Sequence, residues 1–446
     1  LWSIQGLLKV IGGQGFDYYL SDWYWIPSRA IPGEPITEFP FFTFLYGDPH
    51  AHLFSLPITL IALLWGLSIL LIKDELWRSF KNNFLSILFG SIVIGALKVT
   101  NTWDFPIFLA ICLIILGYKL FQSYFLNSFN KDNHSENKGY SNLWSAIFLM
   151  TFFIAMSMII YYPFSKWYGQ AYTSFEFWNG SHTPLSSYLT HWGYFFFITV
   201  SWWIWELWNW MANTPLSVLR QWLKFRHSIL FVLVLILIGF SWLVLKGIEI
   251  SWIVIPLILL VLFIFFNQSK SDIHRFIDLL SLVGWGLTLM VEVIVLKGDI
   301  GRMNTVFKFY LQAWTLIAVT SSCYALQFIP IAVRKWSGKW KQVWLTLFAI
   351  LLVGTCLYPI SATIAKITDR MSNQIPLTFD GMDYMKSSTY SVNGATLDLY
   401  QDYQAIRWMQ MNVKGSPVIV EANVPEYQWG NRFTVYTGLP GVVGWN

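Results

Sequence analysis

The sequence predicts an all-α polytopic membrane protein with about ten transmembrane helices, followed by a small α/β domain. Two features predict this fold class. Of the 446 residues, 55% are hydrophobic and only 12% are charged, whereas a soluble domain is about 25% charged. The apolar residues also gather in long runs, as bilayer-spanning segments require. This composition excludes a disordered chain, a nucleic-acid-binding protein and a typical cytosolic enzyme.

The apolar runs are the candidate transmembrane segments. Because a bilayer cannot satisfy a free backbone, each run is expected to be helical, and the sequence lacks the period-two alternation of a membrane β-barrel. The runs cover residues 53–72, 84–100, 105–121, 143–162, 192–211, 228–245, 251–266, 276–296, 308–330 and 343–360.

Lysine and arginine concentrate in alternate loops between these runs. The first and last such loops contain Lys73, Arg78 and Lys81, and Arg334, Lys335, Lys339 and Lys341. The positive-inside rule places these loops in the cytoplasm. The segments on the opposite side are aromatic, proline-rich and dotted with acidic residues, so we expect function on the extracytoplasmic face.

The chain is expected to contain three parts. Residues 1–52 form an extracytoplasmic loop with acidic and histidine residues, residues 53–360 form the transmembrane bundle, and residues 361–446 form an extracytoplasmic α/β domain. In this last part we expect a helix around Asp402–Asn412 and then a buried strand at Val418–Ala422. We also expect that the domain continues past residue 446 and that a helix precedes residue 1.

The first candidate site lies just before the first apolar run. Asp48, His50 and His52 occupy alternate positions, so an extended chain would place them on one side, as a metal site or an acid–base pair requires. Glu38 lies upstream in the same motif. The alternative is that Asp48 is the N-cap of the following helix, with Pro49 at its first position.

A second candidate is the short outer turn that ends in Asn101-Thr102-Trp103-Asp104. A carboxylate at a membrane boundary suits either a helix cap or a functional site.

A third candidate is the loop at residues 297–308. It contains Asp299, Arg302, Asn304 and Lys308, and the arginine fork and lysine charge suit the phosphate of a lipid headgroup. The alternative is a basic loop that touches ordinary phospholipid. Glu292, inside the preceding run, is expected either to be functional or to pair with Lys297.

Other polar residues are weaker candidates. Asp22 lies in the aromatic N-terminal segment, where it would be an acid of an acceptor site or part of a packed lid. His182 and His191 lie in the long outer loop, and surface exposure is the expected state for both.

Taken together, these motifs resemble a prokaryotic membrane family, the YYY membrane proteins or domain of unknown function 2298. The segments that carry the resemblance are Asp17–Tyr19, Asp22–Pro32, Glu38–Pro40, Tyr46–His52, Asn101–Asp104, Arg302–Tyr310, Glu421, Arg432, Tyr436–Pro440 and Gly444–Trp445.

The layout of this family is in turn similar to that of the GT-C membrane glycosyltransferases. The resemblance implies transfer of a sugar from a polyprenyl-phosphate-linked donor to an unknown acceptor, at the outer face of a prokaryotic plasma membrane. Asp48 would be the general base, or would bind Mg²⁺ or Mn²⁺ together with Asp104. His50 and His52 would complete the catalytic site. The residues assigned to substrate binding are Arg302, Lys308, Asp299, Asn304, Asp22, Arg29 and Glu38.

Two other functions stay open. A transporter would need polar groups near the middle of several spans, for which Glu206 and Glu292 are the candidates. A non-catalytic scaffold of an envelope complex would hold the three outer motifs far apart. Membrane lipid is an expected partner in every case.

Overall fold

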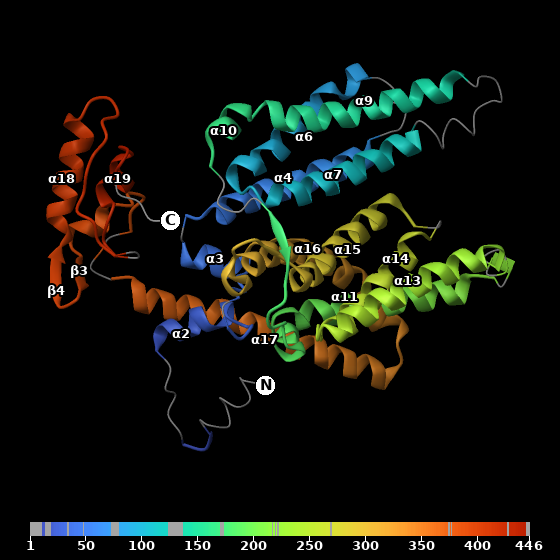
Figure 1. Ribbon diagram of the computed structural model, residues 1–446. Helices are drawn as coiled ribbons and strands as arrows, with labels where there is room; N and C mark the ends of the chain where they lie inside the picture. Colours follow the sequence, from blue (N-terminus) through green and yellow to red (C-terminus); the bar gives the residue numbers. More distant parts are fainter. Residues whose placement is uncertain are drawn as a thin grey trace. The chain divides into compact units, whose positions relative to one another are not determined.

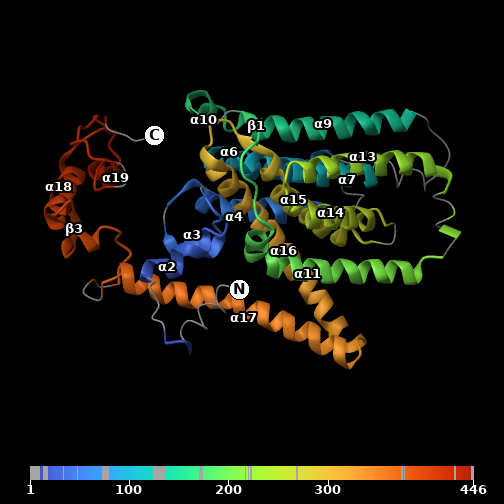
Figure 2. The ribbon, with the colours of Figure 1, turned by 60° about the horizontal axis from the view of Figure 1, so that its bottom comes forward.

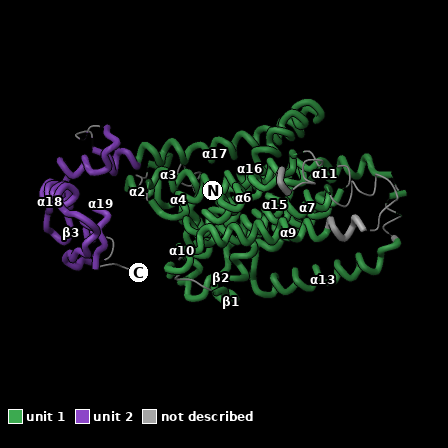
Figure 3. Tube along the Cα trace, turned by 90° about the horizontal axis from the view of Figure 1, so that it is seen from above, with its two compact units in different colours: residues 1–365 green, residues 366–446 purple. Residues whose placement is uncertain are grey.

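The computed structural model forms two compact units, residues 1–365 and residues 366–446 (Figure 3). It describes residues 11–13, 19–33, 35–47, 49–72, 80–123, 137–169, 174–215, 217–218, 220, 223–267, 270–372, 375, 377–425 and 428–442.

The first unit is built from helices (Figure 1). Those described are α2 (Leu20–Trp25), α3 (Pro40–Tyr46), α4 (Ala51–Leu71), α6 (Phe80–Thr100), α7 (Asp104–Phe121), α9 (Asn137–Ile159), α10 (Tyr162–Trp167), α11 (Leu185–Asn213), α13 (Arg226–Leu245), α14 (Ser251–Phe265), α15 (Asp272–Val293), α16 (Met303–Lys335) and α17 (Gly338–Arg370). Single 3-10 turns lie at Ile26–Ser28, Leu223–Phe225 and Ile300–Arg302.

The helical membrane fold predicted from the apolar runs is confirmed, whereas the count of ten spans is not. Each run falls largely within one helix. Among the described residues, seven helices are long and apolar enough to cross a membrane, namely α4, α6, α7, α13, α15, α16 and α17. The apolar parts of α9 and α14 are shorter, at Leu143–Ile159 and Ser251–Phe265. Helix α11 is 29 residues long but is not among the seven.

The helices pack around one large apolar core. Helices α4, α6, α7 and α9 pack against one another, and α15 packs along α16 and α14 (Figures 1 and 2). Bulky rings fill the centre, with Trp192, Trp203 and Trp285 each fully buried. By contrast, only 6% of the apolar span is buried in each of α13 and α17, so their side chains are left for lipid.

A two-stranded sheet fixes one loop to the end of α15. Strand β1 (Phe175–Phe177) pairs antiparallel with β2 (Ile294–Leu296), with Glu176 opposite Val295. The ladder continues where Trp178 donates its backbone N–H to the carbonyl of Val293 at 2.9 Å. The chain from Trp178 onward is therefore held against the last turn of α15.

The second unit contains a hairpin and two helices. Strands β3 (Thr389–Val392) and β4 (Ala395–Asp398) are joined by Asn393-Gly394, both with positive φ, as a tight hairpin turn requires. Asp398 caps α18 (Leu399–Asn412) by accepting from the N–H of Tyr400 at 3.0 Å. The second helix is α19 (Arg432–Thr437). A small core forms around Met385, Leu399 and Ile406.

The helix expected around residues 402–412 is confirmed and begins earlier, at Leu399. The buried strand expected at Val418–Ala422 is wrong. Ile419 makes a single parallel bridge to Gly441, and Val418 and Val420 are 64% and 77% exposed. The β-branched sequence lacks a partner strand over its length within the described residues, so its propensity is not realised.

The contact between α15 and α16 gives a test of the fold. A Cβ atom at Gly284 would lie 2.7 Å from Cγ1 of Ile317, whereas a Cβ atom at Gly286 would meet nothing within 4 Å. Gly284→Ala should therefore lower the free energy of unfolding by about 1–3 kcal/mol through overpacking. Gly286→Ala, its matched control, should leave it equal or raise it by up to about 1 kcal/mol because alanine favours helix. Unfolding in mixed micelles measures both, and equal effects would contradict this packing.

Candidate functional site

Asp104, at the first position of α7, has a carboxylate that is buried and held by amide groups. Its Oδ2 accepts from Nδ2 of Asn101 at 3.1 Å, and its Oδ1 accepts a short hydrogen bond from Nε2 of Gln312 on α16. Ser55 and His52 on α4 lie beside it. The side chain is 2% exposed, so these partners replace the water that the carboxylate has lost.

Glu38 and His52 form the second part of this site. Nε2 of His52 lies 3.5 Å from Oε2 of Glu38, which also accepts from the hydroxyl of Thr43 at 3.3 Å. The imidazole packs edge-on against Phe307 with ring centroids 4.5 Å apart. We call Glu38, His52, Asp104 and Gln312 the polar centre. It brings two of the three sequence motifs together.

Asp48 lies outside the described residues, so its predicted roles stay predictions. Its neighbours show how the chain turns there. Gly47 ends α3 in the left-handed region at φ 68°, and His50 is the N-cap residue of α4. Helix α4 begins at Ala51, so Pro49 does not occupy its first position as the capping alternative predicts. The His50 ring lies 5.4 Å from that of His52.

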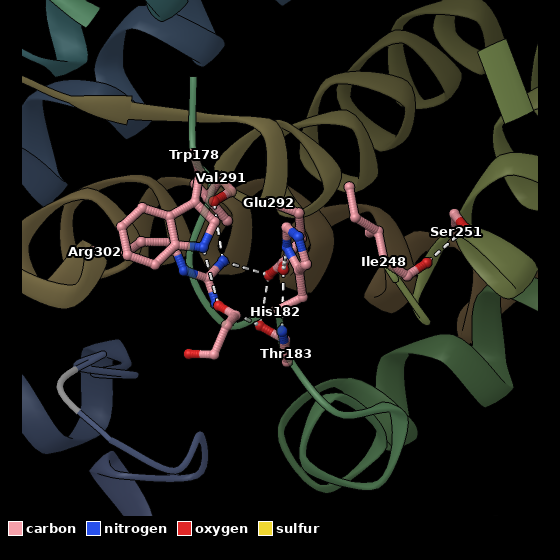
Figure 4. A network of polar contacts seen from close by, with 9 residues as sticks. Trp178, His182, Thr183, Ile248, Ser251, Val291, Glu292 and Arg302 are labelled. Carbon is pink, nitrogen blue, oxygen red and sulfur yellow. Dashed lines mark hydrogen bonds and ion pairs between the residues drawn. The ribbon is translucent and has the colours of Figure 1, made fainter. Parts of the chain in front are cut away.

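The third motif forms a separate cluster around a buried ion pair, shown in Figure 4. Nη1 of Arg302 lies 2.8 Å from Oε1 of Glu292 and donates to the carbonyl of Val291 at 3.0 Å. The guanidinium carbon is 5.4 Å from the ring centre of Trp178. Both charged side chains are almost fully buried. The expected pair between Glu292 and Lys297 is wrong, since Arg302 is the partner.

The loop before α11 completes this cluster. Thr183 donates its backbone N–H to Oε2 of Glu292 at 3.0 Å and its hydroxyl to Oε1. Nδ1 of His182 lies 3.2 Å from the same Oε2. The surface positions expected for His182 and His191 are wrong. His182 is partly buried against Glu292, and His191 stacks on Tyr310 at 5.7 Å.

Asp299 and Asn304 have a structural role at the start of α16. The Asp299 carboxylate accepts from the backbone N–H of Asn304 at 3.1 Å and from the N–H of Thr305 at 2.7 Å. It therefore caps the helix. The side chain of Asn304 also donates to it, at 3.2 Å. Lys308, one turn further, is partly buried near the same carboxylate.

The two remaining candidates lie in the N-terminal segment. Asp22 accepts from the backbone N–H of Tyr19 at 2.9 Å and so supports the first turn of α2. Arg29 lies over the ring of Trp25 at 4.4 Å. Burial lowers the pKa of Arg29, and the charge of Glu38 acts in the opposite direction. Arg29 therefore interacts electrostatically with Glu38 of the polar centre. The hydrogen bond described for Asp22 lies within the first turn of its own helix, α2.

The metal prediction has no support from the described side chains. Across the part of the chain that the structure describes, no group of three or more His, Cys, Asp and Glu residues is placed to hold a metal ion. Both oxygens of Asp104 already accept amide hydrogen bonds. A cation site that includes Asp48 stays a prediction.

A cavity of about 340 Å³ opens beside the Arg302–Glu292 cluster. Its lining includes Glu292 but not Asp104, Asp299 or Arg302, so the candidates do not share it. It is lined by Phe177, Trp178, Asn179, His182, Trp242, Lys246, Ile248, Glu292 and Val293.

Gln312 and Thr183 are the functional candidates that the sequence motifs missed. Gln312 lies in the apolar run at 308–330, where an uncharged amide is a polar exception that should have drawn attention. Thr183 gave no signal in the sequence, because threonine is common in loops and its partner Glu292 is 109 positions away.

A family model described as "Uncharacterized membrane protein (DUF2298)" matches residues 3–317. No curated protein and no solved structure matches the chain.

The buried ion pair predicts a distinctive pattern of stability. Glu292→Gln or Arg302→Gln alone should lower the free energy of unfolding by about 3–5 kcal/mol, because each leaves one buried charge without its partner. The double variant should lose less than the sum of the two. Unfolding in mixed micelles provides the measurement, with the exposed Glu176→Gln as a control that should change stability by under about 0.5 kcal/mol. Additive losses in the double variant would contradict the pair.

Proposed function

This chain belongs to the DUF2298 family of uncharacterized membrane proteins, and for it we propose a membrane glycosyltransferase with the polar centre as its reaction site. The donor is a sugar on a polyprenyl phosphate at the extracytoplasmic face. The support is the burial of His52 and Asp104 beside one another, with the partly buried Glu38 next to His52. Ionisable groups in a lipid-facing bundle are costly and mark functional sites by default.

The proposed reaction needs one proton transfer. An acceptor hydroxyl attacks the anomeric carbon of the donor, the bond from that carbon to the phosphate oxygen breaks, and the phosphate leaves with the electron pair. Asp48 takes the hydroxyl proton in the proposed mechanism. His52 is held by Glu38, as the base in a hydrolase triad is held by its carboxylate. This arrangement suits a group that orients the acceptor or relays the proton.

Asp104 and Gln312 are proposed to position the acceptor. Both oxygens of Asp104 have amide donors, which fix its orientation. Within the described chain, Oε1 of Gln312 is buried without a hydrogen-bond partner. An acceptor hydroxyl is a suitable donor for it, because an unsatisfied buried acceptor costs about 1–3 kcal/mol.

Arg302 and Lys308, the proposed phosphate ligands, could bind a phosphate only under one further condition. Arg302 already pairs with Glu292 at 2.8 Å, so a phosphate there would have to share its guanidinium with that carboxylate.

The two candidate carboxylates, Glu206 and Glu292, do not support the transporter alternative. Glu206 shares Lys270 with Asp278, and their oxygens lie 3.3 Å and 2.6 Å from Nζ, respectively, while Glu292 is paired with Arg302. Both candidates are therefore held in ion pairs inside the protein.

Substitutions in the polar centre test the proposed activity. In an assay of sugar transfer from a polyprenyl-phosphate donor, Asp48→Asn should lower the rate by about 10²–10⁴ if it removes the base. Asp104→Asn and His52→Gln should lower the rate while leaving the protein folded. Glu176→Gln, an exposed carboxylate on β1, is the matched control and should transfer at the normal rate.

Near-normal turnover of Asp48→Asn would reject the base role. Normal turnover of both Asp104→Asn and His52→Gln would reject the polar centre as the reaction site.

A further inference from the structure

The cavity beside Glu292 combines aromatic walls with polar groups. Phe177, Trp178 and Trp242 supply rings, and Asn179 and His182 supply polar atoms. Its volume of about 340 Å³ lies within the range of small-molecule sites, about 300–1,000 Å³. Its lining comes from the β1 loop, the end of α13 and the end of α15, all assigned to the same membrane face by the loop charges.

The electrostatic balance of this cavity favours an anion. Among the described lining residues Glu292 is the one carboxylate, and Arg302 pairs with it at 2.8 Å. Lys246 therefore adds a positive charge that the lining does not cancel. Among the described residues, no carboxylate lies within ion-pair distance of Lys246. The nearby Glu249 accepts from the N–H of Leu185 at 2.8 Å and is not among the described lining residues.

The helix that ends at Lys246 indicates where an apolar chain would lie. Trp242 lies in the last turn of the apolar span of α13, of which only 6% is buried, and Lys246 directly follows the span. Ile238 and Leu245 are 61% and 86% exposed. Tryptophan and lysine at the end of such a span are typical of the membrane–water boundary. A ligand in the cavity would therefore have exposed apolar helix surface next to it.

We propose that this cavity binds the phosphate group of a lipid, with Lys246 as its main charged ligand and the lipid chain along α13. The inference goes beyond the proposed function. The described lining of this cavity contains none of the residues of the polar centre, so the cavity is a second lipid site and not the place where the donor's bond to phosphate breaks.

Binding of farnesyl phosphate to the purified full chain in detergent micelles tests the proposal. Lys246→Gln should weaken binding by at least about tenfold, since a hydrogen bond to a charged group contributes about 1.5–3 kcal/mol. Lys297→Gln, at an exposed lysine outside the cavity, removes the same charge and should weaken binding less than twofold. Farnesol, without the phosphate, and inorganic phosphate, without the chain, should both bind more weakly.

Unchanged binding by Lys246→Gln, or equal weakening by both lysine variants, would overturn the site. Inorganic phosphate that binds as tightly as farnesyl phosphate would overturn the lipid as its source. Asp104→Asn separates this inference from the proposed function. This variant should bind farnesyl phosphate normally and should lose sugar transfer. Weakened binding would count against the cavity, and normal transfer would count against the polar centre, so the two failures can be told apart.

Discussion

No water reaches the hydrocarbon core of a bilayer, so a polar group inside the bundle needs a partner from the protein or from a bound ligand. This constraint explains the arrangement of the buried charges. Arg302 and Glu292 neutralise each other, and Asp104 receives amide donors from Asn101 and Gln312. The contact of Asp104 with Gln312 joins α7 to α16 across 208 positions of the sequence, and the pair of Arg302 with Glu292 joins the start of α16 to α15. The polar groups therefore specify how the helices pack, whereas the apolar surfaces alone would allow several arrangements.

Helix α16 connects the two polar clusters. Asp299 caps its first turn, and Arg302 just before that turn reaches Glu292 on α15. Further along, Phe307 packs on His52 and Gln312 reaches Asp104. One helix thus contributes Gln312 to the proposed reaction site, and Arg302 at its N-cap holds Glu292, which lines the cavity.

Much of the fold was predictable because apolar runs report directly on burial in lipid. The motifs around His52 and Asp104 were also visible, since charged and histidine side chains stand out beside apolar sequence. Their partners were not. Gln312 lies 208 positions from Asp104, and such pairing depends on packing that no local pattern encodes. The same reason explains the errors: local spacing suggested Lys297 for Glu292, and β-propensity suggested a strand at Val418–Ala422 that has no extended partner among the described residues.

The contact between Asp104 and Gln312 is the part of the account on which the polar centre depends most directly. A double-mutant cycle on unfolding in mixed micelles, with Asp104→Leu, Gln312→Leu and both together, measures their coupling. We expect the double variant to lose less stability than the sum of the single losses, with a coupling of about 0.5–3 kcal/mol. Strictly additive losses would show that the two side chains do not interact, and would contradict the polar centre.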